Sequence, residues 1–218
     1  LNYSDVKIGS AVFKERLEAA GVYCHKSHQT LRPVMALNDA VMQSIVFEQP
    51  EFQRVLNWMR AQVITETKGV FEDVHADVGG LRYDFGTGGL HASVNSRVFR
   101  AAGSRVIEGR DVASYYPTLS IANRWYPAHL SEVFCDLSEV MFIERRSFPK
   151  GTDENATLKL ALNGGTFGDT NNKYSAFYDP LHTMRITLNG QLLLALLCEK
   201  LIKAPTLQVS FANTYGVA

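Results

Sequence analysis

Cysteine is scarce in this sequence. The 218 residues include three cysteines, Cys24, Cys135 and Cys198, which lie far apart and form neither a Cys-x-x-Cys pair nor an even set for disulfides. This usage argues against a disulfide framework and fits a reducing compartment. Long apolar runs are also missing, because the stretch 192–197 is too short to cross a bilayer and the first residues do not resemble a signal peptide. We therefore expect no membrane partner.

A net charge is missing as well, since 22 Lys and Arg residues balance 22 Asp and Glu residues. No global basic field would draw in nucleic acid, which counts mildly against a nucleic-acid enzyme without excluding one. Basic residues nevertheless outnumber acids within 81–110, where the only acids are Asp84 and Glu108. A phosphate backbone could use this excess, and a solvated hairpin explains it equally well. The basic residues of this segment are Arg82, Arg97, Arg100, Arg105 and Arg110.

Two common binding signatures are absent from the sequence. Cys24, His25 and His28 crowd together, but no second ligand pair follows at zinc spacing, so a zinc site is disfavoured. The glycine-rich stretch 85–91 lacks the Gly-Lys-Ser/Thr of a P-loop, and its glycines alone are a weak signal.

The first part of the chain is predicted to be mainly helical. A length of 218 residues suits one large domain or two small ones, and 46% apolar residues allow a real core. Apolar residues at helical spacing predict helices at 10–20, near 38–45 and after Pro50. Ser10 would cap the first helix and Gly21 would end it.

Short strands separated by glycines replace this pattern from about Gly69. Gly103 separates 94–100 from 105–107 in the manner of a hairpin, and the apolar residues of the second segment predict a strand that leads to Asp111. An acid at the exposed end of a strand can reach a metal ion. Taken alone, Asp111 would more often be a helix cap or part of a surface turn. A helix-permissive segment, 118–124, follows.

A helical hairpin is predicted next, with helices at 131–146 and 153–163. Arg146 and Lys150 lie at its bend, while Lys159 and Asn163, which are four residues apart, share a face of the second helix. Three cations on one face would hold a triphosphate. Scattered surface charges are the simpler alternative.

The last segment is predicted to combine strands and one strongly apolar helix. The pattern favours a strand at 185–188, a helix at 190–203 that Pro205 stops, a strand at 206–211 and a turn at 213–216. The sequence opens at Leu1 rather than Met and ends at Ala218 within the expected hairpin, so we expect a fragment of a longer protein.

Several of these pieces resemble, in one order, the motifs of family B DNA polymerases. The segment 111–118, D-V-A-S-Y-Y-P-T, resembles their first polymerase motif, D-x-x-S-L-Y-P-S. The segment 159–168, K-L-A-L-N-G-G-T-F-G, resembles the second, K-x-x-x-N-S-x-Y-G. The stretch 85–91 is similar to the Y-x-G-G element before the palm, and 174–188 with the following Gly-Gln-Leu is similar to the bacteriophage branch. The resemblance covers the chain from Phe85 to its end and is vague before that.

This resemblance implies an α+β fold with a palm-like antiparallel sheet and a two-helix fingers hairpin, preceded by a mainly helical segment. Residues 1–68 would be a helical lead-in, either the end of an exonuclease-like region or a linker. Residues 69–130 would form the first palm segment, 131–168 the fingers, and 169–218 a second palm segment that ends at a degenerate third motif.

The resemblance also assigns roles around the first motif. Asp111 would bridge both catalytic metal ions, and the Val112 carbonyl would help to hold the ion bound to the nucleotide. The backbone around Ser114 and Tyr115 would lie against the triphosphate. Tyr116 would lie under the sugar and exclude a 2′-hydroxyl group, which gives a preference for deoxynucleotides.

Other residues would bind the phosphates and the template. Arg146, Lys150 and Lys159 would be finger cations on the phosphates, with Lys159 counted as catalytic, and Asn163 would support that surface. The residues on the template side would be Gly88, Gly89 and His91. The implied cofactors are two Mg²⁺ ions, with Mn²⁺ as a substitute. The implied partners are primer-template DNA, deoxynucleoside triphosphates and accessory replication proteins, in the cytoplasm of an infected bacterium.

The chain departs from the family pattern at two places. The second motif has one extra residue, with Gly164 and Gly165 where a single small residue is expected, so we expect a loosened or shifted helix end. The third motif should be an acidic turn, D-T-D or N-T-D-G, but here Asn213 and Thr214 precede Tyr215 and Gly216. A neutral phenol is a poor ligand for a hard divalent cation.

Three hypotheses follow. The first is template-directed DNA synthesis in phage replication, in which a two-metal mechanism transfers deoxynucleotides to a primer 3′-OH. The second is an inactive or truncated relative that binds nucleic acid or nucleotide without extending a primer, and Tyr215 favours it. The third is a globular domain of helices and strands whose motif matches are accidental. The ordered series of motifs argues against the third.

Overall fold

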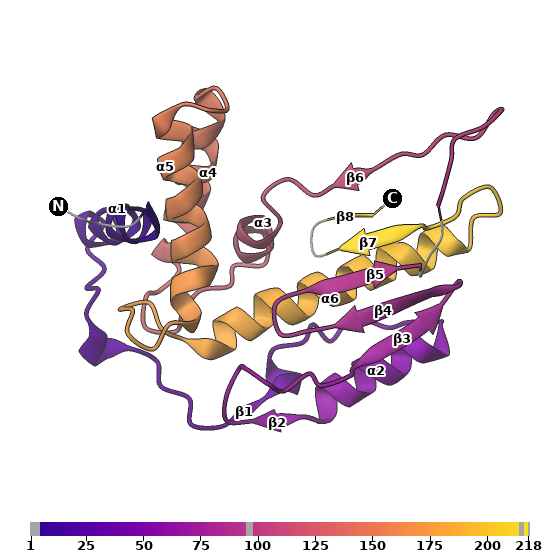
Figure 1. Cartoon of the computed structure of the whole chain (residues 1–218). Helices are drawn as coiled ribbons and strands as arrows, with labels where there is room; N and C mark the ends of the chain where they lie inside the picture. Colours follow the sequence, from indigo (N-terminus) through magenta and orange to yellow (C-terminus); the bar gives the residue numbers. More distant parts are fainter. Residues whose placement is uncertain (1–4, 95–97, 214–215, 218) are drawn as a thin grey trace. The chain divides into compact units, whose positions relative to one another are not determined.

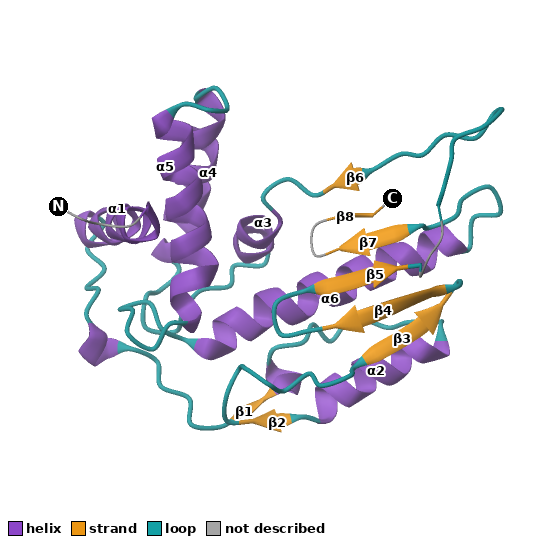
Figure 2. Cartoon of the chain, viewed as in Figure 1, coloured by secondary structure: helices purple, strands orange, loops and turns teal. Residues whose placement is uncertain are grey.

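A computed structural model describes residues 5–94, 98–213 and 216–217 of the chain. Helices and antiparallel strands both occur in it (Figure 2), so the predicted α+β class is confirmed. The chain forms two compact units. We call residues 1–33 with 116–186 the helical unit, and residues 34–115 with 187–218 the sheet unit. Each unit combines pieces of several predicted segments, and the predicted domain boundaries remain a prediction.

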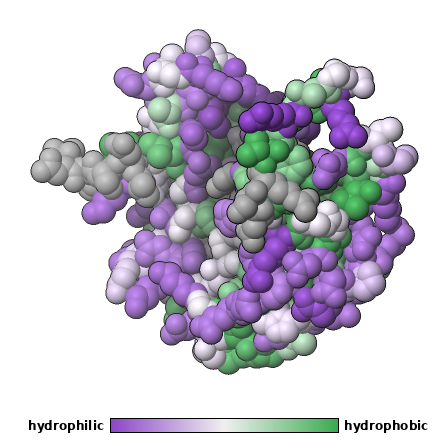
Figure 3. Space-filling model, turned by 45° about the vertical axis from the view of Figure 1, so that its right-hand side comes forward, coloured by the Kyte–Doolittle hydropathy of each residue, from purple (hydrophilic) through white to green (hydrophobic). Residues whose placement is uncertain are grey.

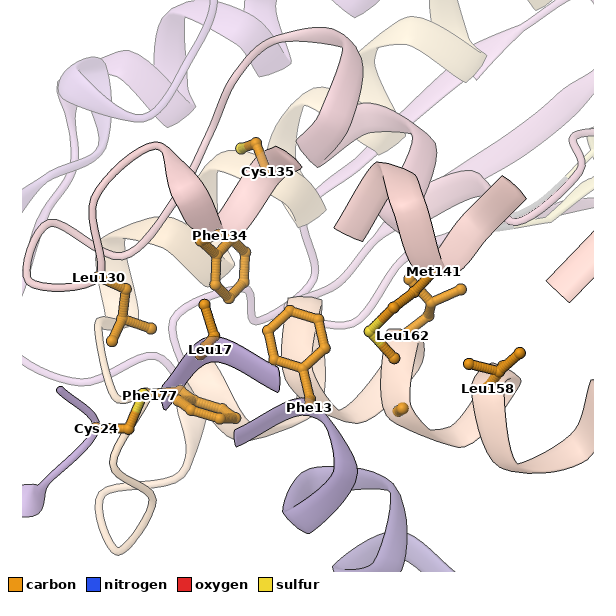
Figure 4. Close-up of a cluster of buried hydrophobic side chains, with 11 residues drawn as sticks. Phe13, Leu17, Cys24, Leu130, Phe134, Cys135, Met141, Leu158, Leu162 and Phe177 are labelled. Carbon is orange, nitrogen blue, oxygen red and sulfur yellow. The ribbon is translucent and has the colours of Figure 1, made fainter. Parts of the chain in front are cut away.

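The helical unit is built from α1 (Asp5–Ala19), α4 (Val133–Ser147), α5 (Asp153–Asn163) and most of α3 (Tyr115–Ala122). Its aromatic core joins α1, α4 and a loop (Figure 4), because the ring of Phe13 lies 5.2 Å from that of Phe134 and 5.7 Å from that of Phe177. Full burial of such rings is a large favourable term in the stability of a domain of this size. The other members of this core are Leu17, Cys24, Leu130, Cys135, Met141, Leu158, Ala161 and Leu162.

The bend between α4 and α5 is closed by one buried amide. The side chain of Asn155 donates hydrogen bonds to the carbonyl oxygens of Phe148 (2.9 Å) and Arg145 (3.1 Å). Thr152 caps α5 by accepting a hydrogen bond from the Asn155 N–H. The predicted helical hairpin is therefore confirmed, and the predicted bounds of its second helix, 153–163, are those observed.

A π-helical turn, η3 (Gly164–Gly168), follows α5 directly and leads into the 3₁₀ turn η4 (Asp169–Asn171). A π turn takes one more residue per hydrogen-bonded ring than an α-helix. The expected alteration at the extra residue of the second motif is thus present. His182 supports the turn, because its buried Nε2 lies 2.9 Å from the Thr166 carbonyl oxygen.

Helix α6 (Pro180–Ile202) belongs to both units, and the predicted strand at 185–188 is wrong because these residues lie inside the helix. Asp179 caps α6 through the Leu181 N–H (3.2 Å) and also accepts hydrogen bonds from the Arg32 guanidinium (2.7 and 3.3 Å). Proline at the first helical position is a regular start signal. The β-branched residues at 186 and 187 are typical of strands, and they led to the wrong prediction despite this proline.

The main sheet of the sheet unit, in the described part of the chain, has six antiparallel strands in the spatial order β3-β4-β5-β7-β8-β6. In Figure 1 they run across the sheet in this order. Their bounds are His75–Val78 (β3), Leu81–Phe85 (β4), Leu90–Ser93 (β5), Arg110–Asp111 (β6), Phe211–Asn213 (β7) and Gly216–Val217 (β8).

One face of this sheet is buried. Along β4 the residues Leu81, Tyr83 and Phe85 are buried while Arg82 and Asp84 are exposed, the period of two expected of a half-buried strand. Tyr83 packs edge-on against Phe52 of α2 (Pro50–Ala61) and lies beside Cys198 of α6. Helices α2 and α6 therefore share the buried face, which leaves the other face of the sheet to solvent. A separate ribbon pairs β1 (Met35–Ala36) with β2 (Val63–Ile64).

Three further predicted elements in this unit are wrong. Only a 3₁₀ turn, η2 (Leu37–Asp39), occupies the predicted helix at 38–45. Backbone groups of this segment form hydrogen bonds to distant side chains in place of the hydrogen bonds of a helix. The Met42 N–H donates to the Asn189 side chain, and the Arg60 guanidinium donates to the carbonyl oxygens of Met42 and Ile45. Among the described residues of 94–109 there is no strand, and Val106 is 83% exposed, so no partner supports the predicted hairpin. Of the residues 206–211, which were predicted to form a strand, Phe211 alone lies in one, at the start of β7.

Candidate functional site

Asp111 lies next to the hairpin that carries the third motif. It pairs with Gly216 in the β6–β8 register, and Gly216 pairs in turn with Asn213 in the β7–β8 register. The Asn213 side-chain oxygen also accepts a hydrogen bond from the Gly216 N–H at 3.0 Å. Thr214 and Tyr215, between these two positions, lie outside the described residues.

The same line continues across the sheet to the predicted template side. Asn213 pairs with His91 of β5. Side chains at directly opposed positions of antiparallel strands project from the same face. Neighbouring strands are about 4.8 Å apart, so Asp111 and His91 are separated by roughly 14 Å, three strand spacings. We call His91, Asn213, Gly216 and Asp111 the transverse row. It lies on the face opposite buried Ala92, Ala212 and Val217.

The turn after Asp111 is held in a fixed conformation. Ser114 has φ of 48°, in the left-handed region, and α3 begins at the next residue. The buried Tyr115 hydroxyl donates a hydrogen bond to the Gly190 carbonyl oxygen of α6 at 2.8 Å, and burial raises the pKa of Tyr115. Half-buried Val112 and Ser114 are thereby anchored beside the exposed Asp111. A fixed turn of this kind can present backbone groups to an anionic ligand without reorganising.

The predicted template-side glycines lie in the β4–β5 connection. Gly86 at its start donates its N–H to the Gln191 side chain of α6 (3.1 Å) and to the Gly89 carbonyl (3.0 Å). Gly88 is exposed, and nothing lies within 4 Å of where a Cβ would stand. The glycine loop therefore lies beside the His91 end of the transverse row, with open space at the position of a Gly88 side chain.

Tyr116 lies in the helical unit and contacts the second motif. Its buried ring is 4.8 Å from the ring of Phe167, which belongs to the π turn. The sequence prediction missed Phe167. Its signal was present, because Phe167 replaces the tyrosine in the K-x-x-x-N-S-x-Y-G pattern. Parts of the first and second motifs are thus packed together within one unit.

The predicted finger residues are all exposed on α4, α5 and their bend. Arg146 lies in the last turn of α4 with its guanidinium 4.4 Å from the centre of the Phe142 ring, and Lys150 lies in the bend. Lys159 and Asn163 are exposed one turn apart on α5. Within the described residues none of the three cations is held in an ion pair, so their charges can meet an anion. The surface of this hairpin is mostly polar (Figure 3), although Val140 and Ile143 of α4 are also exposed.

These residues fall into two sets that the structure places separately. Asp111, Asn213, His91 and the glycine loop belong to the sheet unit, together with Val112, Ser114 and Tyr115. Tyr116, Arg146, Lys150, Lys159 and Asn163 belong to the helical unit. The strand pairings bring Asp111, Asn213 and His91 into one row, and in the helical unit Tyr116 contacts Phe167 of the second motif.

The donors around Asp111 suit one hard cation. Magnesium commonly binds one or two carboxylates and completes its shell with phosphate oxygens and water. Asp111 supplies one exposed carboxylate and Val112 a nearby carbonyl, whereas the Asn213 oxygen already accepts a hydrogen bond. The described residues contain no group of three or more His, Cys, Asp and Glu side chains that could hold a metal ion.

Comparison of the chain with protein-family models, with curated proteins and with solved structures gave no match. In the part of the chain that the structure describes, no helix has both the length and the apolar character of a membrane span.

Proposed function

We propose that this chain is the palm-and-fingers portion of a DNA-directed DNA polymerase of the family B type, which transfers deoxynucleotides to a primer 3′-OH during phage replication. The observation that carries the proposal is the transverse row. It sets the first-motif aspartate against the third-motif hairpin, with the predicted template-side histidine on the same face of the sheet.

The chemistry of phosphoryl transfer suits such an arrangement. Catalysis of this reaction rests on positioning and on neutralising charge, with little covalent work for the protein. Asp111, at the exposed end of β6, and the Val112 carbonyl would hold magnesium, which when bound neutralises charge on the phosphate oxygens. The anchored turn at Ser114 would lie against the triphosphate.

The helical unit supplies complementary groups. Arg146, Lys150 and Lys159 would bind phosphate oxygens through charge-assisted hydrogen bonds. The packing of Tyr116 against Phe167 supports a rigid aromatic floor under the sugar, where a 2′-hydroxyl would have no room. Deoxynucleotides would therefore be preferred over ribonucleotides.

A second candidate function is nucleotide binding without extension. It is favoured by the composition of the third motif, where Tyr215 replaces an acid and leaves Asp111 as the single carboxylate of the two motifs. Magnesium can be bound through a single carboxylate, with phosphate oxygens of a nucleotide and water completing its shell. Both candidates therefore predict nucleotide binding that depends on magnesium, and they differ only in primer extension.

The assignment of Asp111 is tested by nucleotide binding. Titration of a fluorescent deoxynucleoside triphosphate with magnesium should show at least a tenfold loss of the magnesium-dependent affinity in Asp111→Asn, because the ligand carboxylate is gone. Asp77→Asn is the matched control, since Asp77 is exposed on β3 at the far edge of the same sheet. Equal magnesium dependence in Asp111→Asn and Asp77→Asn would remove the metal-binding role.

A further inference from the structure

Two loops of the helical unit, 22–30 and 171–178, lie side by side although they are far apart in sequence. The Gln29 side chain donates hydrogen bonds to the carbonyl oxygens of Lys173 (3.0 Å) and Ser175. The Thr30 N–H donates to the Tyr178 carbonyl at 3.1 Å. We call these two segments the paired loops. The bonds between them fix a continuous surface from residues that neither loop carries alone.

Aromatic rings stand out on this surface. Tyr23 is 61% exposed and Tyr174 is 66% exposed. The Tyr23 ring stacks on His25 with 6.0 Å between ring centres and an interplanar angle of 22°, and it meets His28 edge-on at 5.0 Å. The core of the unit leaves both tyrosines to solvent, so hydrophobic burial within this chain does not account for them.

Two lysines flank the Tyr174 ring. The ammonium groups of Lys26 and Lys173 lie 5.6 and 5.3 Å from the centre of the Tyr174 ring. Neither paired loop contains an acidic residue. Exposed cation–π contacts are weak, so the two ammonium groups keep their charge and can still bind an anion.

A groove of about 540 Å³ lies beside the paired loops, and His25 and Lys26 of the first loop form part of its lining. Lys7 and Lys14 of α1 add two more cations to its wall, and Lys14 pairs with Glu18 at 3.5 Å across one helical turn. Among the described residues that line the groove, the one acid is Asp169, which is buried, and burial raises the pKa of its carboxyl group against the effect of a hydrogen bond from Ser10. The groove is thus predominantly positive.

We propose that the paired loops and this groove bind single-stranded nucleic acid. Bases would stack on Tyr23 and Tyr174, and phosphates would meet Lys26, Lys173 and the lysines of the groove. Exposed rings interleaved with cations are what single strands need, because their bases offer free π-faces and their backbone offers a regular row of negative charge. A duplex keeps its bases stacked inside and could use only the cations. The proposal is independent of Asp111 and of nucleotidyl transfer.

Fluorescence anisotropy of a labelled oligothymidine with the full chain tests this proposal. The Tyr23→Leu/Tyr174→Leu variant should bind about tenfold more weakly for each ring lost, while Tyr23→Phe/Tyr174→Phe, which keeps both rings, should bind like the wild type. The Lys26→Ala/Lys173→Ala variant should bind more weakly and show a shallower salt dependence. The control Lys68→Ala/Lys200→Ala removes the same charge from exposed positions in the sheet unit.

Three results would overturn the proposal. One is equal affinity of the leucine and phenylalanine variants, with circular dichroism showing both folded. Another is affinity for a duplex of equal length that matches the affinity for oligothymidine. The third is tighter binding to phosphatidylserine vesicles than to the oligonucleotide, which would assign the surface to membranes. The assay contains neither a deoxynucleoside triphosphate nor magnesium, so its outcome does not depend on that of the Asp111 experiment.

Discussion

Asp111 and Gly216 face each other so closely that position 216 admits no side chain. A Cβ at Gly216 would stand 2.2 Å from the Arg110 carbonyl oxygen and 3.0 Å from the Asp111 Cα. These are backbone atoms, so no rotation of a flexible side chain can relieve the overlap. The closeness of β6 to the third-motif hairpin therefore depends on this glycine.

Gly216→Ala should accordingly separate β6 from β8 and lower the free energy of unfolding by about 2 kcal/mol, the usual cost of forcing extra volume into a packed site. Urea unfolding followed by circular dichroism measures this loss. Gly109→Ala is the control, because nothing lies within 4 Å of a Cβ there. If both variants lose the same stability, the close approach of Asp111 and Gly216 is not a determinant of the sheet.

Lys159→Ala should weaken binding of a deoxynucleoside triphosphate roughly tenfold, because a charge-assisted hydrogen bond to phosphate is lost. Thermal protection by nucleotide with magnesium provides the measurement. Lys200→Ala, an exposed lysine of α6 in the sheet unit, is the matched control. Full protection of the Lys159 variant would contradict the assignment of α5 to the triphosphate.

The pair of Arg32 and Asp179 should make stability depend on acid pH. Burial alone would raise the pKa of Asp179, but hydrogen bonds from Arg32 and the Ala128 N–H outweigh it and lower this pKa below the ordinary value. A lowered pKa in the folded state stabilises the protein above about pH 4, where an unfolded aspartate is ionised, and this contribution is lost as the pH falls through the folded pKa.

The prediction is that Arg32→Gln lowers the free energy of unfolding by about 2 kcal/mol at pH 6 and by less at pH 3, since hydrogen bonds to buried charged groups contribute on this order. Unfolding curves of both proteins across this range give the difference. A gap between wild type and variant that does not narrow towards pH 3 would mean that Asp179 is not the titrating partner.

The sequence predicted best the elements that local signals define. Helix α5 begins after the Thr152 cap and ends before two glycines, and the helix after Pro50 follows from its apolar spacing. The predictions at 38–45 and 185–188 failed because distant groups decide those segments. Asn189 and Arg60 hold the first out of a helix, and Asp179 starts a helix before the second.

The site was predictable as a set of residues and not as an arrangement. Asp111 does lie at the end of a strand, but this strand consists of Arg110 and Asp111 alone and not of the apolar residues 105–107 from which it was predicted. Two of the pairings in the transverse row, β5–β7 and β6–β8, join strands that lie far apart along the chain, at His91 and Asn213 and at Asp111 and Gly216. No local pattern specifies such a register, because it is set by the packing of the buried face. The contact between the paired loops was not predicted either, because it joins two segments that lie far apart in the sequence.

The central claim is that the turn 213–216 and Asp111 form one catalytic centre that lacks an acid at Tyr215. Primer extension with magnesium and deoxynucleotides tests it most directly, comparing the wild type with Tyr215→Asp and, as a neutral control of the same size as Asp, Tyr215→Asn. A restored carboxylate should raise the extension rate about a hundredfold over the wild type and the Asn variant, since metal ligation stabilises the transition state by several kcal/mol. Addition of Asp111→Asn should abolish the gain. A Tyr215→Asp protein that extends the primer no faster than Tyr215→Asn would contradict the account.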